Sequence, residues 1–199
     1  MILSCSINYL KGHKVSNFAT MPEAIDITPL VGASEERGVM VRLHMIKAGT
    51  KDEIAELMRP CVESAYSKSF SAKFLGAAYF ALTITKDEAV IATLAAIWLP
   101  CPANTFESRF ESVHKDHQRK GYGTMIFRAL EVAGLFLAKH DPFIAVNVGG
   151  CPTLAIHAYV DVKKTSHPLF WHTNMMLNLG YKQIEVTRKE RLMEKIIDL

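Results

Sequence analysis

Cysteine is scarce and scattered in this chain of 199 residues. The four cysteines, at Cys5, Cys61, Cys101 and Cys151, form no CxxC pair and have no histidine at the spacing of a zinc ligand. This pattern argues against a disulfide framework and a structural zinc site, and we predict no metal. Scattered, reduced thiols are typical of an intracellular protein, and we expect a cytoplasmic one.

Strong charge and long apolar segments are also missing. The formal net charge is +3 and no basic stripe stands out, which argues against direct nucleic-acid binding. The longest apolar runs, near 74–84 and 89–99, are too short to span a bilayer, and a charged turn separates them. The first ten residues carry no basic segment ahead of their apolar part, so we expect no signal peptide and no membrane association.

A mixed α/β pattern fills the chain from residue 39 onward. The hydrophobic pattern predicts strands at 39–46, 79–85, 89–99, 106–114, 143–148 and 182–187. A capping box at 50–53 predicts a helix that Pro60 kinks or divides into two segments. A second helix is expected from about Gly121 to His140, and a late one ends at Leu179. We predict an α/β layered domain at 39–199 after an N-terminal extension at 1–38.

The most informative stretch is the loop at 118–123 (QRKGYG), between an expected strand and an expected helix. Unpaired N–H groups and the positive end of the helix dipole make such a junction an anion site. Gly121 and Gly123 allow the backbone to approach a phosphate closely, and Arg119 and Lys120 add positive charge. The loop fits neither GxGxxG, because Ile126 stands at the third glycine position, nor GxxxxGK[ST]. The alternative is an ordinary turn capped by glycine.

This loop resembles the acyl-CoA-binding signature of the GNAT superfamily of N-acetyltransferases, Gln/Arg-x-x-Gly-x-Gly/Ala after a strand that ends in an apolar residue. Gln118, Gly121 and Gly123 match it, and Val113 stands at the apolar position. Downstream, the segment 174–181 (NMMLNLGY) resembles the late helix of the family, which ends in Leu-Gly-Phe/Tyr before a strand. The resemblance covers roughly 39–199. It implies a mixed, mostly antiparallel sheet flanked by helices, with splayed strands forming an acyl-CoA cleft.

The resemblance implies that acetyl-CoA is the cosubstrate and that its acetyl group passes directly to a primary amine in a ternary complex. The acceptor would be a protein lysine, a protein N-terminus or a small amine, and a histone acceptor would imply a nuclear location. A homodimer is compatible with this interpretation. The backbone at Val113 would hold the thioester and the pantetheine arm. The residues implied for binding the rest of the cosubstrate are Gln118, Arg119, Lys120, Gly121, Tyr122, Gly123 and Thr124.

A base is needed because a free lysine, with a pKa near ~10.4, must lose a proton before it attacks. Glu107 and Glu111 share a face with Val113 if the strand is regular. In the histone-acetyltransferase branch of the family the catalytic glutamate lies fourteen residues before the first glycine, which corresponds to Glu107. A β-bulge would change that count and favour Glu111. Two histidines, His114 and His117, are further candidates.

The general acid is harder to assign. Many members of the family place a tyrosine four residues before the glycine of the late motif, where this chain has Met176. Tyr159, Tyr181 or solvent would then protonate the departing thiolate, and Tyr159 is the tyrosine we select.

About twenty residues more than the family needs, roughly 149–168, precede the late helix. We predict a long loop there, either a neutral excursion or an acceptor-recognition element built from Cys151, His157, Tyr159, Asp161, Lys163, Lys164 and His167. Trp171 and His172, at the start of the late helix, could line the acceptor cleft or pack in the core.

The sequence therefore favours an acetyl-CoA-dependent N-acetyltransferase. The absent tyrosine motivates the alternative, a non-catalytic acyl-CoA sensor or scaffold with the same fold. An open path from Val113 to the surface, beside a carboxylate or an imidazole, would favour the enzyme.

Overall fold

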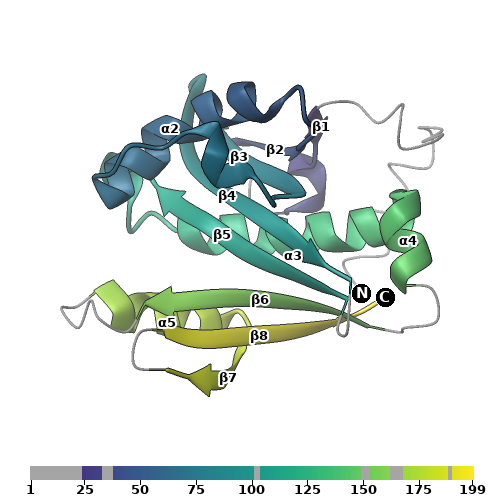
Figure 1. Ribbon diagram of the computed structural model, residues 1–199. Coiled ribbons are helices and arrows are strands. Elements are labelled where there is room, and N and C mark those ends of the chain that lie inside the picture. Colours follow the sequence, from purple (N-terminus) through teal and green to yellow (C-terminus); the bar gives the residue numbers. More distant parts are fainter. Residues whose placement is uncertain (1–23, 33–37, 101–103, 149–152, 162–167, 188–189) are drawn as a thin grey trace.

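In the computed structural model, the described residues include eight strands that form one continuous sheet, in the order β1-β2-β3-β4-β5-β6-β8-β7 (Figure 1). All neighbouring strands are antiparallel except β5 and β6, which are parallel. The structure describes residues 24–32, 38–100, 104–148, 153–161, 168–187 and 190–199. The strands are β1 (Ala24–Asp26), β2 (Met40–Met45), β3 (Phe80–Lys86), β4 (Ala89–Leu99), β5 (Thr105–Val113), β6 (Thr153–Asp161), β7 (Lys182–Val186) and β8 (Glu190–Asp198).

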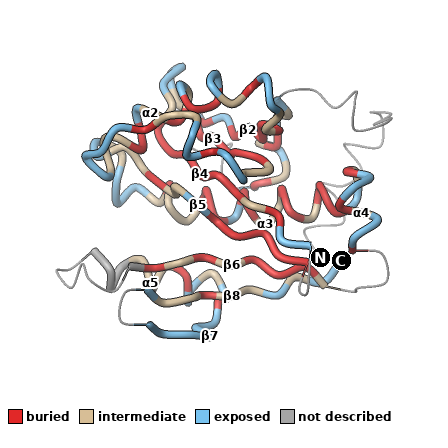
Figure 2. The backbone as a smooth tube through the Cα atoms, in the orientation of Figure 1, coloured by how far each residue is buried: buried red, intermediate tan, exposed pale blue. Residues whose placement is uncertain are grey.

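Helices cover both faces of the sheet. On one face, α2 (Lys51–Tyr66) packs on β4 and β5 and encloses a small core that includes Ala81 and Ala95. On the other face, α3 (Tyr122–His140) packs on β3 to β6 over a larger core that includes Leu82 and Leu94. The remaining helices are α4 (Pro142–Val148), α5 (Pro168–Asn178) and the short η3 (Thr28–Leu30), η5 (Ala72–Leu75) and η6 (Lys115–His117). Figure 2 shows burial concentrated on the central strands and α3, whereas β7 is exposed throughout.

Gly134 brings α3 unusually close to the sheet. A Cβ atom at this position would lie 2.8 Å from Leu154 Cδ2 and 3.3 Å from Phe106 Cδ2. Real Cβ atoms do not approach other atoms as closely as 2.8 Å, so a larger residue would force the neighbours to move. The helix thereby packs against β5 and β6 at once and holds these two strands together at their beginnings.

The segment predicted as a strand at 143–148 is helical, so that prediction was wrong. Asp141 explains the helix, because its Oδ1 accepts hydrogen bonds from the N–H groups of Phe143 at 2.9 Å and Ile144 at 3.3 Å. Its Oδ2 accepts a bond of 2.6 Å from the Tyr79 hydroxyl. A capping aspartate followed by proline at the first helical position is a favourable helix start, and here it outweighs the β-branched residues that follow.

The strand that takes this place in the sheet is β6, which lies inside the segment predicted as a long loop. Its alternate residues Leu154, Ile156, Ala158 and Val160 are buried, so the loop prediction was wrong for 153–161. Four residues considered there, Cys151, Lys163, Lys164 and His167, lie outside the described part of the chain.

The predicted division of the first helix is also wrong. α2 runs from Lys51 to Tyr66 as one helix with Pro60 inside it. The expected capping box is not formed, because the Thr50 hydroxyl makes no cap hydrogen bond and instead accepts one from the N–H of Lys47 at 3.0 Å. None of the helices in the described segments is both long and apolar enough to cross a membrane.

Candidate active site

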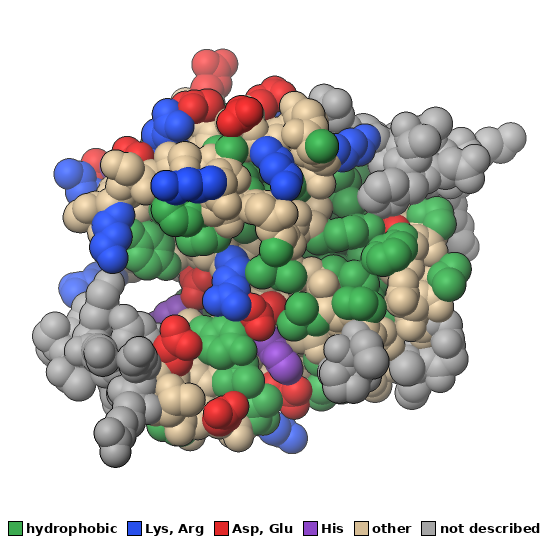
Figure 3. Space-filling view, in the orientation of Figure 1, with side chains coloured by type: hydrophobic (Ala, Val, Ile, Leu, Met, Phe, Trp, Pro, Cys, Tyr) green, Lys and Arg blue, Asp and Glu red, His purple; other side chains and the backbone are tan. Residues whose placement is uncertain are grey.

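β5 and β6 begin as neighbours and then separate. Their parallel ladder has three register pairs, Thr105↔Ala155, Phe106↔Ile156 and Glu107↔His157. β5 continues to Val113 against β4, while β6 continues to Asp161 against β8. The carboxyl-terminal halves of the two strands therefore diverge, as Figure 1 shows. In the space-filling view the surface is hollowed between the two halves of the molecule on that side (Figure 3).

We call the region between the diverging halves of β5 and β6 the opening. A β-bulge interrupts β5 beside it. Arg109 pairs with Ala95 and Ser112 with Thr93, so Phe110 and Glu111 together oppose one residue of β4. Phe110 has a φ of 53°, in the left-handed region that bulky residues avoid. Glu107 and Val113 are six residues apart on β5, but the residues that they oppose on β4, Ile97 and Ala92, are only five apart. The bulge therefore changes the face of the sheet to which the later side chains of β5 point. The strand is therefore not regular, and Glu107 and Val113 do not share a face.

The backbone of Val113 is directed toward the opening. The N–H of His114 bonds to the carbonyl of Ile91 at 2.9 Å, which makes Ala92 and Val113 a non-hydrogen-bonded pair. In such a pair the N–H and C=O of Val113 point away from β4, and the next strand on that side is the diverging β6. The carbonyl of Val113 accepts a bond of 3.2 Å from Gln118 Nε2, which ties the following loop to the strand end.

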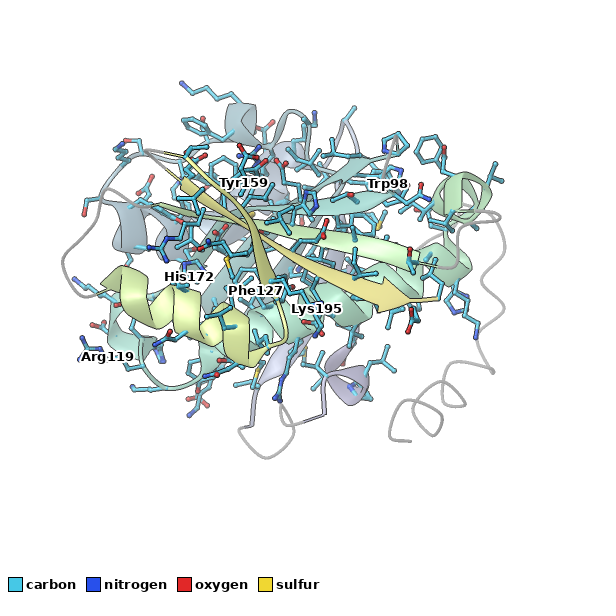
Figure 4. The ribbon with its side chains drawn as sticks, turned by 90° about the horizontal axis from the view of Figure 1, so that it is seen from below. Trp98, Arg119, Phe127, Tyr159, His172 and Lys195 are labelled. Carbon is cyan, nitrogen blue, oxygen red and sulfur yellow. The ribbon has the colours of Figure 1, made fainter. Side chains whose placement is uncertain are left out.

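The loop after β5 has the backbone geometry expected of an anion site. Arg119 has a φ of 60° and Gly121, the residue before α3, has a φ of 85°. The first N–H groups of α3 have no acceptor within the helix and lie at the positive end of its dipole. Lys120 Nζ bonds to the carbonyl of Asp116 at 2.8 Å, and Arg119 is exposed. Figure 4 shows Arg119 projecting at this end of the molecule.

α5 packs against the first turn of α3. A Cβ atom on Gly123 would lie 3.3 Å from Met175 Sδ, so any side chain there would require a small movement of the Met175 side chain. Met176 is fully buried in the core, as is Tyr181 at 2% exposure. The position at which the family usually has its acid therefore carries a core side chain in this chain. The ring of His172 lies 5.9 Å from that of Phe127, and burial lowers the pKa of this histidine.

A polar cluster spans the start of the opening. Glu107, which is buried, forms an ion pair with Arg109, two residues further along the same strand. The guanidinium carbon of Arg109 lies 5.2 Å from the ring centroid of Tyr159 on β6. Burial raises the pKa of Tyr159, and the charge of Glu107 and a hydrogen bond with it add to this shift. The structure thus brings together two of the residues predicted to be catalytic, Glu107 and Tyr159, and the side chain of Arg109 on β5 contacts both.

Glu111 occupies the bulge itself. Burial raises the pKa of Glu111 to about 7 from its usual 4.5, while its own backbone N–H and the charge of Arg109 act in the opposite direction. The carbonyl of Glu111 accepts a hydrogen bond of 2.8 Å from the Tyr66 hydroxyl at the end of α2. A carboxyl with this pKa is half ionised near neutral pH, which suits a proton acceptor.

The remaining candidates lie around this centre. His114 precedes η6 and His117 is its last residue, and their ring centroids lie 6.1 Å apart. The His114 side chain accepts a hydrogen bond from the N–H of Asp116. On β6, His157 Nε2 lies 2.9 Å from Glu194 Oε2 on β8. The described residues contain no cluster of His, Cys, Asp or Glu that could hold a metal ion.

Sequence reasoning did not select Arg109, Tyr66 or the pairing of His157 with Glu194. The alternation of a strand could have found Arg109, because residues two apart on a strand share a face and Arg109 follows Glu107 by two. Nothing local points to Tyr66, since its contact with Glu111 joins residues 45 positions apart.

Comparison with known proteins agrees with this geometry at the level of fold. No protein-family model matches the chain, and no curated protein matches it in sequence. Among solved structures, the IAA acetyltransferase of Bacillus cereus superposes with a TM-score of 0.54 at 12% identity, covering 79% of this chain and 99% of the other. The ribosomal-protein-S18-alanine N-acetyltransferase of Escherichia coli gives a TM-score of 0.51 at 14% identity, covering 80% and 96%.

A GNAT-family protein of Desulfovibrio desulfuricans gives a TM-score of 0.51 at 15% identity, covering 79% of this chain and 98% of the other. The protein therefore has the GNAT fold, with an open, mostly antiparallel eight-stranded sheet that contains one parallel pair. This confirms the fold predicted from the sequence motifs.

Proposed function

We propose that this protein transfers an acetyl group from acetyl-CoA to a primary amine by direct attack in a ternary complex. The observation that carries the proposal is the opening between β5 and β6, which is bordered by the buried Glu107 and the half-buried Glu111 and ends at the loop 118–123, here called the anion loop. A thioester at one end and a phosphate group at the other would match these two ends of the opening.

Residues around the opening fit acetyl-CoA in two places. The N–H of Val113 points into the opening and would donate to the thioester carbonyl, where negative charge develops. The N–H groups of the loop and the first turn of α3, with the charge of Arg119 beside them, would hold the pyrophosphate. Acetyl-CoA, when bound, supplies an acetyl carbon that forms a bond to the amine nitrogen while its bond to sulfur breaks.

Glu111 is the base that we favour. The attacking amine must give up a proton, and a carboxylate with a pKa of about 7 accepts it far more readily than one with a pKa of 4.5. Glu107 also faces the opening, but its carboxylate is engaged by Arg109 and Tyr159. In this proposal Glu107 positions Tyr159 and Arg109, and Glu111 removes the proton.

Tyr159 is the acid that we favour. Its pKa is raised, so the hydroxyl keeps its proton at neutral pH and can donate it to the departing thiolate. The tyrosine belongs to β6, the strand that lines the opposite side of the opening from Val113. It would replace the tyrosine that the late helix lacks at Met176.

The proposal is tested by measuring CoA release from acetyl-CoA with a panel of polyamines, aminoglycosides, amino acids, arylalkylamines, and lysine or N-terminal peptides. Turnover with at least one acceptor, lost in Glu111→Gln, is the expected result. The alternative function, an acyl-CoA-binding sensor or scaffold, is favoured by the buried Met176. Binding of acetyl-CoA without turnover on any acceptor would establish that alternative, and absence of binding would refute both.

A further inference from the structure

Four aromatic side chains gather on the α2 side of the opening, and we call them the aromatic shelf: Tyr66, Phe70, Phe74 and Phe110. The ring of Phe110 meets Phe70 edge-on at 5.3 Å and Phe74 at 6.0 Å, and Phe70 stacks on Phe74 at 5.8 Å. The Tyr66 hydroxyl bonds to the carbonyl of the residue after Phe110. The shelf is therefore one packed group that joins the end of α2, the η5 segment and the bulge of β5.

The outer part of the shelf is unusually exposed for aromatic residues. Phe74 is 44% exposed and Tyr66 is 40% exposed, whereas Phe70 is 4% exposed and anchors the group in the core. The shelf also depends on a strained residue, because Phe110 adopts a φ of 53° that costs an L-amino acid conformational energy. Strain of this kind persists where the surrounding structure enforces it, and it concentrates at functional sites.

The shelf is continuous with the proposed catalytic centre. Phe110 lies between Arg109 and Glu111 in the chain, and its ring packs with the α2 core. Hydrophobic side chains border the hollow on the side of α2 in Figure 3. A molecule whose amine reaches Glu111 would therefore have its adjoining atoms beside the exposed rings.

The outermost ring of the shelf already has a cation beside it. Lys73 Nζ lies 5.2 Å from the ring centroid of Phe74, so a positive charge occupies one face of this ring. Arg109, next to Phe110 in the chain, forms an ion pair with Glu107, and its guanidinium lies near the Tyr159 ring. A neutral aromatic group can contact the exposed rings of the shelf without repulsion from Lys73.

We propose that the aromatic shelf binds an aromatic group close to the acceptor amine, so that the acceptor is an arylalkylamine. This inference rests on the proposed acetyl transfer and names its substrate class. Phe74 is a specificity-determining residue in this proposal, since it contacts the part of the acceptor that does not react. Polyamines and lysine side chains, which present methylene chains and a second charge, would gain little from the shelf.

The test compares 2-phenylethylamine, butylamine and spermidine as acceptors for the full chain and for Phe74→Ala. The preferred acceptor is expected to be 2-phenylethylamine. Phe74→Ala should raise its KM about tenfold, the size expected for loss of an aromatic contact, with little change in kcat and none in the KM for butylamine. Phe143→Ala is the matched control, because Phe143 is also an exposed phenylalanine, at 54%, but lies on α4, which packs on α3 on the opposite side of the sheet from the shelf. Its loss should leave the KM and kcat for all three amines unchanged.

A second measurement separates failure of the shelf from failure of acetyl transfer. Binding of 2-(4-fluorophenyl)ethylamine in the presence of CoA is followed by fluorine NMR, which needs no turnover. Binding that Phe74→Ala weakens supports the shelf even if no amine is acetylated. Preference for spermidine or butylamine, equal effects of Phe74→Ala on all three amines, or absence of binding would each overturn the proposal.

Discussion

Replacing Glu111 with glutamine removes the carboxyl group whose pKa burial raises to about 7. A base with this pKa is roughly half ionised at pH 7 and roughly one-tenth ionised at pH 6, so the rate falls about fivefold over this unit and about tenfold for each further unit. For the wild type we expect kcat/KM to rise with an inflection near pH 7. In Glu111→Gln the inflection should vanish and the rate should fall by about 10²- to 10⁴-fold, the usual contribution of a general base.

The assay is the initial rate of CoA release between pH 5.5 and 8.5 with the best acceptor of the panel. Glu107→Gln is the matched control, because it makes the same chemical change on the same strand but removes the carboxylate that Arg109 holds. It should lower the rate less and keep the inflection near pH 7. The reasoning is refuted if Glu111→Gln keeps the inflection, or if Glu107→Gln alone abolishes it.

Stability gives a readout of Glu111 that does not depend on activity. The pKa of Glu111 is higher in the folded protein than its ordinary value of 4.5, so the native state binds more protons at this residue than the unfolded state does. The contribution of Glu111 therefore lowers the free energy of unfolding as the pH rises from 4.5 through 7. The full effect is on the order of 3 kcal/mol above pH 7. Glu111→Gln should therefore be more stable than the wild type at pH 8, and the difference should shrink toward pH 4.5.

Three further perturbations test other parts of the molecule. Burial, with help from the charge of Arg42, lowers the pKa of His44 to about 4 from 6.5. The unfolded chain therefore binds more protons than the folded one between pH 6.5 and 4, and the free energy of unfolding should fall by up to about 3 kcal/mol as the pH falls through this window. Denaturant unfolding of His44→Gln should show a free energy of unfolding that changes less with pH, and a pH dependence equal to that of the wild type would contradict this reasoning. Asp141→Ala should lower the free energy of unfolding by about 1–3 kcal/mol, because α4 loses its cap and Tyr79 loses a buried bond; a melting temperature equal to that of the wild type would count against this role. Gly121→Ala places a Cβ on a residue with a φ of 85°, a strain of about 1–2 kcal/mol. Calorimetric titration should then show a larger loss of acetyl-CoA binding than in Gly123→Ala, whose added Cβ meets the flexible end of Met175 and creates no positive-φ strain; equal effects would refute this assignment of the loop.

The sequence predicted those parts of the fold that local chemistry determines. The strand before the loop, the helix to His140 and the late helix all lie within a few residues of their predicted bounds, because hydrophobic period and turn residues define them. The segment 143–148, predicted as a strand, is a helix, and the segment 153–161, predicted as part of a loop, is a strand. Both are apolar and rich in β-branched residues, and the choice between them depends on pairing with β5 and β8, which are distant in sequence.

The candidate site also has features that local sequence determines and features that depend on contacts between distant residues. The turn at 118–123 before a helix could be predicted because glycine, basic residues and a helix start determine its geometry within a few positions. The face of the sheet on which each glutamate lies relative to Val113 could not be predicted, because it depends on a bulge that begins at Phe110. Phenylalanine has no preference for a positive φ, so no local pattern marks this bulge, and it is the contacts with Phe70, Phe74 and the end of α2 that enforce it.

The single parallel pair in the sheet explains why these features meet at one place. Parallel strands have their carboxyl ends on the same side, so when β5 and β6 diverge, the opening lies at the carboxyl ends of both. The loop that follows β5 and the outer residues of β6 then border the same gap, although 35 or more positions separate them in the chain. Antiparallel divergence would have placed the anion loop and Tyr159 at opposite ends of the strands. In the proposed acetyl transfer, the parallel register of β5 and β6, more than any one side chain, would bring an acyl donor and its acceptor together here.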